Sequence, residues 1–422
     1  MNAAPISSKK NLNVAILSFE GFRHSGGGIA TYIINVAKML SDAGHRIHIF
    51  SSGPSAMTYQ RDANIVIVEV PGAREHFPEA ILPFFRAAHE LNPFDVVEGP
   101  EYGCDARAVV DTFPDIPFVL RLHGPSFSIG KSNCYYVGWK PRIRFALGAI
   151  RRLQLPTDPW RYDSSSDPER IHALQADEIV ANSNATATYC SRIWGLSGDR
   201  LSVVPLPFLP TTEILTLDPA PRSRIVLFVG RLEVRKGVLE LAKAMPIVLR
   251  QHPDVTFRLV GRILPHPGDG RLLSHHVIEL AKSDAANIEI VGSVPYESIP
   301  AELARSSICV FPSDWEASGF ACMEGMAAAR AVVGSASGGM AEIIDHGRTG
   351  LLVEHRAPQA IAAALIELLG CPEKCLQLGA AARASVVDRF APEAILPMQL
   401  AAYERAIANA RKRPPTRRYR AD

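Results

Sequence analysis

The chain contains two successive series of short apolar segments, and a proline-rich stretch lies between them. The first series lies at 13–19, 46–50, 64–70, 95–99, 118–124 and 178–183, and the second lies at 224–230, 256–261, 288–292, 308–313, 331–335 and 350–354. Segments in which apolar residues recur at helical spacing, such as 29–43, alternate with these runs. This alternation predicts parallel sheets that are covered by helices on both faces.

Five prolines fall between Pro205 and Pro221, and this stretch is interpreted as a linker. We therefore predict an α/β chain with two doubly wound, Rossmann-like domains, at 1–207 and 208–390, which face each other across a cleft. Ligands of open parallel sheets bind outside the carboxyl ends of the strands, so the chemistry is expected there.

Composition narrows the class of protein. The net charge is +2, which gives no reason to expect nucleic acid as a partner. Seven cysteines make no disulfide framework, and the pair Cys371 and Cys375 lacks partners for a zinc site, so no metal is expected. Without a signal-like segment or a long apolar span, we expect a cytoplasmic protein.

Three glycines, Gly26, Gly27 and Gly28, separate the first predicted strand from the helix that follows it. Glycines let backbone amides approach a ligand, and a helix N-terminus favours an anion. The GGGxxT pattern and the absence of an acidic residue after the strand at 46–50 do not fit a dinucleotide fingerprint. The sequence is compatible both with a tight turn and with a loop that binds phosphate or sugar.

Charged residues of the second half follow predicted strands. Arg231 and Lys236 come after the strand at 224–230 and could hold a diphosphate, although surface cations are the alternative. Glu316 and Glu324 are separated by seven residues, and the latter lies in a helix predicted at 322–329. Amides at the start of that helix would face an anion, and Glu324 could accept two ribose hydroxyls. Two acids at this spacing also occur by chance.

Taken together, these motifs resemble the E-x7-E signature and flanking sequences of the retaining glycosyltransferases of family 4, which have the GT-B fold. The other motifs occur in the family's order: GGGIATY (26–32), RLHG (121–124), VVPLPF (203–208), FVGRLEVRKG (228–237), RLVG (258–261), VGSVPYESIPAELARSSICVFPS (291–313), GGMAEII (338–344) and HGRTGLLV (346–353). The resemblance spans about 13–390 and is stronger in the second half. It implies a helix at 391–410 that packs back on the first domain, ahead of a basic tail at 411–422.

The resemblance also implies roles for single residues. Arg231 and Lys236 would grip the donor diphosphate, Glu316 would face the transferred sugar, and His123 matches the family's active-site histidine, with a packing or capping histidine as the alternative. The remaining donor-binding residues would be Gly27, Gly28, Val294 near the nucleobase, Ser318, Gly319, Phe320, Ala321, and Glu324 at the ribose.

Two departures from the family pattern concern donor contacts, namely Leu206-Pro207 in place of Asn-Gly, and Arg330-Ala331 in place of x-Pro. No DxD triplet occurs, so we expect transfer without a metal ion or other cofactor, from a nucleoside-diphosphate sugar and with retention of configuration. The alternatives are a phosphorylase or sugar-phosphate synthase on the same plan, and a non-catalytic nucleotide-sugar-binding module.

Basic residues gather in two places. The segment 140–154 interleaves five basic residues with apolar ones, and 411–420 carries six positive charges. Peripheral contact with an anionic membrane at its inner face, and hence a lipid-linked or polysaccharide-precursor acceptor, is one interpretation. A half-buried helix and a solvated tail are the alternatives.

Overall fold

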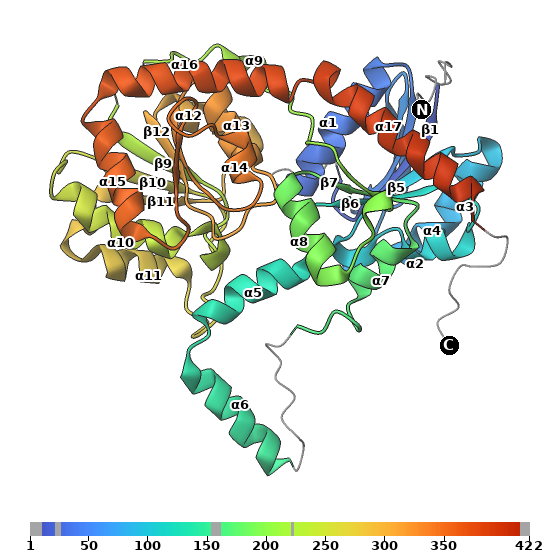
Figure 1. Cartoon of the computed structure of the whole chain (residues 1–422), viewed down its shortest axis with the longest axis horizontal. Helices are drawn as coiled ribbons and strands as arrows, with labels where there is room; N and C mark the ends of the chain where they lie inside the picture. Colours follow the sequence, from blue (N-terminus) through green and yellow to red (C-terminus); the bar gives the residue numbers. More distant parts are fainter. Residues whose placement is uncertain (1–10, 22–26, 153–161, 221–222, 414–422) are drawn as a thin grey trace.

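The computed structural model describes residues 11–21, 27–152, 162–220 and 223–413 (Figure 1). The chain forms two α/β units that lie side by side, and each is built around one sheet. The predicted fold class is confirmed. In the second unit, Val226 and Phe228 of one strand enter a core on one face of the sheet, while Leu227 between them enters the core on the other. This alternation explains why consecutive residues of this strand are apolar.

Within the described part of the chain, the first sheet has eight strands in the order β3-β4-β2-β1-β5-β6-β7-β8, of which only β3 is antiparallel to its neighbour. The strands are β1 (Asn13–Leu17), β2 (Arg46–Ser52), β3 (Met57–Asp62), β4 (Ile65–Val70), β5 (Val96–Pro100), β6 (Phe118–Leu122), β7 (Glu178–Ala181) and β8 (Leu201–Val203). Strands β3 and β8 were not predicted, because β3 is polar and exposed and β8 has only three residues.

The described residues of the second sheet form six strands in the order β11-β10-β9-β12-β13-β14, all parallel. They are β9 (Ile225–Val229), β10 (Thr256–Val260), β11 (Ile288–Gly292), β12 (Ile308–Phe311), β13 (Ala331–Ser335) and β14 (Leu351–Val353). In both sheets the first strand pairs with strands on either side, β1 with β2 and β5, and β9 with β10 and β12. Such switch points are where ligands bind.

Helices cover both sheets. Those of the first unit are α1 (Gly28–Asp42), α2 (Phe77–Ala80), α3 (Leu82–Leu91), α4 (Arg107–Thr112), α5 (Ser126–Tyr136), α6 (Trp139–Arg151), α7 (Pro168–Gln175) and α8 (Asn184–Trp194). The later ones are α9 (Thr212–Leu215), α10 (Val238–Leu249), α11 (Leu273–Ala281), α12 (Ile299–Ala304), α13 (Phe320–Ala327), α14 (Met340–Ile343), α15 (Pro358–Leu369), α16 (Pro372–Arg389) and α17 (Pro392–Arg411).

The chain passes between the units at two neighbouring points. Leu206 is buried in a core of the first unit and Phe208 in a core of the second. The amide of Phe208 donates a 2.8 Å hydrogen bond to the carbonyl of Phe390, just before α17 returns over the first unit (Figure 1). The stretch at 205–221 therefore joins the units while Phe208 and Ile214 pack it against the second.

A buried polar network fixes α17 to the first sheet. The Tyr403 hydroxyl and the Gln399 amide donate to Glu98 of β5 at 2.8 and 3.0 Å. Arg121 of β6 donates to the Tyr32 hydroxyl of α1 at 3.0 Å and to the Val204 carbonyl at 2.8 Å. Buried networks with satisfied partners rigidify a structure, so α17 is an integral part of the first unit.

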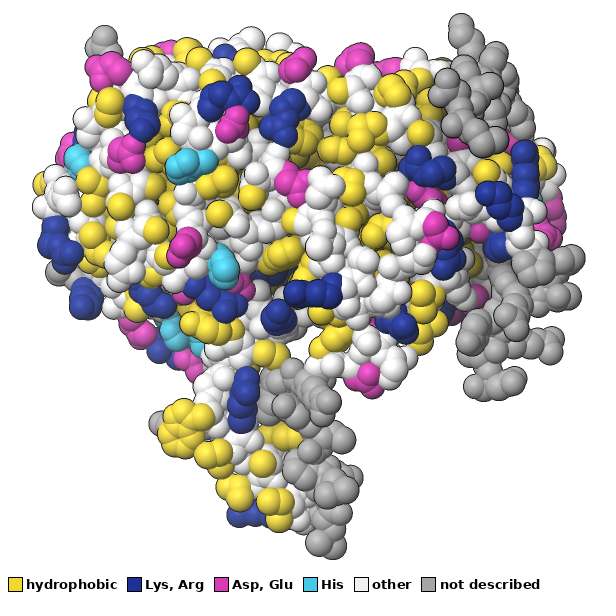
Figure 2. All heavy atoms as spheres, in the orientation of Figure 1, with side chains coloured by type: hydrophobic (Ala, Val, Ile, Leu, Met, Phe, Trp, Pro, Cys, Tyr) yellow, Lys and Arg dark blue, Asp and Glu magenta, His cyan; other side chains and the backbone are white. Residues whose placement is uncertain are grey.

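Helix α5 starts in the first unit and ends against the second. Ser132 donates a 2.5 Å hydrogen bond to Asp314, and Tyr136 packs against the core of the second unit. Helix α6 then projects away from the body of the molecule (Figures 1 and 2). Within the described residues, no helix combines the length and the apolar character needed to cross a membrane.

Candidate active site

The two units meet where loops leave the carboxyl ends of their strands. The carbonyl of Ala317, in the loop after β12, accepts a 3.0 Å hydrogen bond from Ser183, which follows β7. The rings of Tyr189 and Trp315 lie 4.7 Å apart across the same junction. A Cβ on Gly124, after β6, would lie 3.7 Å from Ala317. The loop with Glu316 therefore lies against the first unit at the predicted edge of the sheet.

Lys236 and Glu316 form an ion pair at the start of this loop. The Lys236 ammonium donates to the Glu316 carboxylate, and the Ser313 hydroxyl lies 3.3 Å from the same oxygen. Burial lowers the pKa of Lys236, against the effect of Glu316. Burial alone would raise the pKa of Glu316, but Lys236 and Arg235 outweigh it, so this pKa lies below its usual value. Lys236 is predicted to bind the donor diphosphate and Glu316 to face the transferred sugar, so the ion pair links the two predicted parts of the donor site.

Two arginines near this loop differ in how far their side chains are exposed to solvent. Arg231 is half exposed and lies 3.2 Å from Glu233, so its guanidinium reaches solvent. Arg235 is buried and is held by Glu233 at 2.7 Å and by the Trp315 carbonyl at 3.1 Å. Arg235, which the sequence analysis did not consider, therefore fixes the loop.

Glycines let the backbone pack tightly beneath Glu316. Gly237 has φ +71°, and a Cβ there would lie 1.9 Å from the carbonyl oxygen of Pro312. Gly338 has φ +65°, and a Cβ there would lie 2.2 Å from the carbonyl oxygen of Glu316, which also accepts a 2.7 Å bond from the Gly339 amide. The motif at 228–237 thus packs against the start of the loop at Pro312, and the motif at 338–344 packs against the backbone of Glu316.

Helix α13 begins at Phe320, two residues before the predicted start, which is a correction to the sequence analysis. The prediction failed because Gly319 occupies the cap position and no side chain caps the helix. Its first hydrogen bond joins the Met323 amide to the Gly319 carbonyl, so the amides of 320–322 have no partner within the helix. Four predicted donor-binding residues, Ser318, Gly319, Phe320 and Ala321, surround this N-terminus and are partly buried.

Glu324 is 5% exposed and accepts a 2.8 Å hydrogen bond from the Tyr296 hydroxyl. Burial raises the pKa of Glu324 to about 7, although the hydrogen bond acts in the opposite direction. Tyr296 lies in the loop after β11 together with Val294, which packs against the same core as α13. The sequence analysis missed Tyr296, although the motif at 291–313 contains it.

His123 sits at the end of β6 above the buried network. Its amide and that of Gly124 donate to the Glu101 carboxylate at 2.8 and 2.7 Å, and its ring contacts Tyr32 edge-on at 5.0 Å. Burial, together with Arg121, lowers the pKa of His123 to about 3, so the imidazole is neutral at physiological pH. Burial raises the pKa of Glu101 to about 8.

The glycine loop is described only in part, and Gly26 lies outside the described residues. Gly27 caps α1, and the Thr31 amide donates to its carbonyl at 3.0 Å. Among the residues that the structure describes, a Cβ on Gly28 would meet no atom within 4 Å.

The departures from the family pattern fall at packed positions. Leu206 is buried in the first unit, and Arg330 is 1% exposed and donates to the Asp218 carbonyl at 2.7 Å. Arg330 therefore holds the joining stretch against the second unit.

Two facing doubly wound units, with cations, a helix N-terminus and two carboxylates at the strand ends, define a GT-B glycosyltransferase. Residues 26–208 match the family described as Glycosyltransferase Family 4, and residues 223–371 match Glycosyl transferases group 1. The chain belongs to glycosyltransferase family 4.

Individual relatives agree with this assignment. Spore coat protein SA of Bacillus subtilis is 30% identical over 386 residues, which cover 90% of this chain and 95% of that protein. Alpha-maltose-1-phosphate synthase of Mycolicibacterium smegmatis is 29% identical over 60% of this chain and 71% of its own. The structure of sucrose-phosphate synthase from Thermosynechococcus elongatus superposes with a TM-score of 0.72 at 21% identity, over 94% of this chain and 99% of that one.

Proposed function

We propose that this glycosyltransferase moves a hexose from a nucleoside-diphosphate sugar to an acceptor, with retention of the anomeric configuration and without a metal ion. The observation that carries the proposal is the Lys236–Glu316 pair, in which Glu316 lies four residues before the start of α13 and Lys236 lies five residues after Arg231 in the sequence. This arrangement offers fixed positive charge for a diphosphate next to a carboxylate for sugar hydroxyls.

In the proposed reaction the bond from the anomeric carbon to the diphosphate oxygen breaks, and a bond to the acceptor oxygen forms on the same face. The acceptor's proton passes to the leaving diphosphate. Arg231, Lys236 and the amides at 320–322 stabilise the charge that develops on the diphosphate. An ammonium has three donors, so Lys236 can keep Glu316 while it binds phosphate. Ionised Glu324 accepts the ribose hydroxyls, and Glu316 orients the sugar.

A sugar-phosphate synthase is the second candidate, and two relatives favour it by their names, alpha-maltose-1-phosphate synthase and sucrose-phosphate synthase. The same donor site would serve, and the acceptor would be a phosphorylated sugar or phosphate itself. Supplying both kinds of acceptor with one donor separates the two functions.

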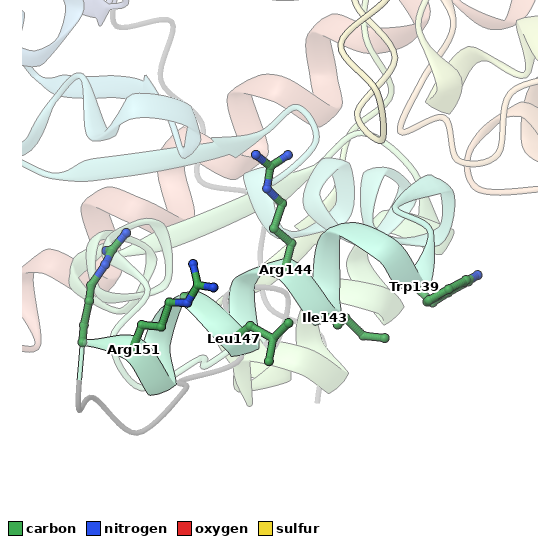
Figure 3. A pocket seen from close by; sticks show the side chains of 7 residues that line it. Trp139, Ile143, Arg144, Leu147 and Arg151 are labelled. Atoms are coloured by element: carbon green, nitrogen blue, oxygen red, sulfur yellow. The ribbon is translucent and has the colours of Figure 1, made fainter.

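Helix α6 favours an acceptor at an anionic membrane. Its exposed apolar side chains recur at helical spacing along the helix, and Figure 3 labels Trp139, Ile143 and Leu147 among them, together with Arg144 and Arg151. Trp139 is 67% exposed and Leu147 is 56% exposed, and residues 139–152 contain no acidic residue. Apolar groups inserted between basic ones fit an anionic lipid surface. We infer that the acceptor is lipid-linked.

The donor proposal is tested by thermal shift with UDP, GDP and ADP sugars. A ligand that binds the folded state raises the melting temperature. We expect one nucleotide series to stabilise the chain and Glu324→Gln to weaken that shift. Product analysis by NMR then gives the anomeric configuration. No shift with any of the nucleotides, or an inverted product, would contradict the proposal.

A further inference from the structure

Outside the candidate active site, three side chains with metal-ligating atoms converge on the second unit. His266 and Asp269 belong to the loop between β10 and α11, and His276 lies on α11. Nε2 of His276 lies 3.1 Å from the Asp269 carboxylate, and Nδ1 of His266 lies 3.4 Å from it. One ligand atom from each residue lies within 4.8 Å of the others.

These separations match a tetrahedral metal site. Bonds of about 2.0–2.2 Å to histidine nitrogen and carboxylate oxygen place neighbouring ligand atoms about 3.3 Å apart around a tetrahedral ion. Both measured contacts to Asp269 are close to that value. The two imidazole rings are 4.6 Å apart, so they face the carboxylate from neighbouring directions. The cluster needs only small side-chain adjustments to surround an ion.

The loop is held in shape before any ion binds. The His266 amide donates to the Arg271 carbonyl at 2.8 Å, and the Gly270 amide donates back to the His266 carbonyl at 2.9 Å. The Gly268 amide also donates to Nδ1 of His266 at 3.1 Å. A bound ion would replace this amide at the lone pair of Nδ1.

We propose that His266, Asp269 and His276 bind one divalent transition-metal ion of the zinc class. Two imidazoles and one carboxylate suit Zn²⁺, whereas Mg²⁺ prefers oxygen ligands alone. The three ligands do not include Arg231, Lys236, Glu316 or Glu324, although their loop pairs with Leu232, next to Arg231. The proposal therefore gives the ion a structural role and leaves the diphosphate chemistry metal-free.

The position of the loop indicates what the ion stabilises. A Cβ on Gly268 would lie 2.9 Å from the carbonyl oxygen of Tyr136, and the Tyr136 ring lies 6.3 Å from that of His266. Tyr136 ends α5, the helix that reaches from the first unit to the second. An ion that fixes the loop to α11 would therefore stabilise the surface of the second unit that contacts the end of α5.

The test uses the full chain without an affinity tag, and Zn²⁺ alone as the probe in competition with a chromophoric chelator. We expect one tight ion per chain, and at least about 10-fold weaker binding in His266→Asn, Asp269→Asn and His276→Asn. His275→Asn is the matched control, because His275 is the exposed neighbour on the same helix. Zn²⁺ should raise the melting temperature of the wild type and of this control, but not of the other three.

Three results would overturn the proposal: no tight Zn²⁺ in the wild type, unchanged affinity in all three triad variants, or an equal loss in His275→Asn. Asp269 is exposed, so its variant keeps the test valid if a histidine variant fails to fold. Co²⁺ in place of Zn²⁺ gives a second readout, since a tetrahedral site gives intense visible absorption that His276→Asn should remove.

Discussion

The carboxylate of Glu342, on α14 of the second unit, accepts a 2.7 Å hydrogen bond from the amide of Ala185 at the start of α8 in the first unit. The amide and the side chain of Asn184 donate to the same carboxylate at 3.0 and 2.9 Å. A negative charge is favourable at a helix N-terminus, so Glu342 fastens one unit to a helix of the other.

Glu342→Gln should weaken this contact between the units. The amide keeps the size of the side chain but removes its charge, which costs about 1–2 kcal/mol of the closed arrangement. We expect kcat/KM to fall about 10-fold and small-angle scattering to report a larger radius of gyration. Glu354→Gln, at an exposed acid of the same unit, is the control. Equal kinetics in both variants would show that closure does not depend on Glu342.

Arg231→Ala and Lys236→Ala should each reduce transfer by about 100- to 1,000-fold, because each removes preorganised positive charge from the leaving diphosphate. Binding of the nucleoside diphosphate, measured by calorimetry, should weaken in parallel. Lys243→Ala changes a partly exposed lysine of α10 and should have no effect. Lys236→Ala also leaves Glu316 without its partner, so melting curves must accompany the kinetics. Normal turnover in both variants would remove the diphosphate assignment.

Donor affinity should fall as pH decreases through about 7. The pKa of Glu324 is raised to about 7 by burial, and the protonated carboxyl accepts ribose hydroxyls less well than the carboxylate. We expect the donor KM to rise about 10-fold from pH 8 to pH 6 and to be flat in Glu324→Gln. Tyr296→Phe removes a hydrogen bond that lowers this pKa and should move the midpoint upward. A pH dependence that persists in Glu324→Gln would assign it to another group.

Transfer should continue in excess EDTA at a temperature well below the melting point. In our proposal, charged side chains and backbone amides stabilise the diphosphate, and the chain contains no DxD triplet. Radiolabelled donor turnover with and without chelator measures this. A complete loss of turnover that Mg²⁺ or Mn²⁺ restores would contradict metal-free transfer, whereas a lower melting temperature alone would report the His266 site.

Helix α6 should carry the chain to anionic vesicles. We expect flotation with phosphatidylglycerol vesicles at low salt and none with phosphatidylcholine. Ile143→Asp combined with Leu147→Asp should abolish it, because each apolar side chain contributes about 1.5–3 kcal/mol on burial and a charge opposes insertion. Leu91→Asp, at a residue that is 88% exposed on α3, is the control. Flotation of the double variant would discard α6 as the contact.

The second unit could be predicted from the sequence more completely than the first. Its strands β12 and β13 are apolar and fully buried, so each produced a clear signal. In the first unit, β3 is recognisable only through its pairing with β4, because its own side chains are exposed. Local pattern finds strands with apolar side chains and misses edge strands that a neighbour stabilises.

Contacts between residues that are far apart in the sequence could not be predicted from the sequence. Lys236 and Glu316 were each predicted as site residues, but their ion pair is visible only in the structure. Tyr296, like the cluster of His266 with His276, shows its role only through neighbours brought close by folding. The placement of Arg231 and Glu324 as donor ligands is still a prediction, which the experiments above test.

The two crossings between the units are joined by the bond from the Phe208 amide to the Phe390 carbonyl. Because both of these described backbone connections pass through one small region, we expect the units to move relative to each other by rotation about an axis through it. Loops far from that axis would sweep the longest arc, and these include the end of α5 at Tyr136. Closure of the units around the donor would then be accompanied by a displacement of helix α6.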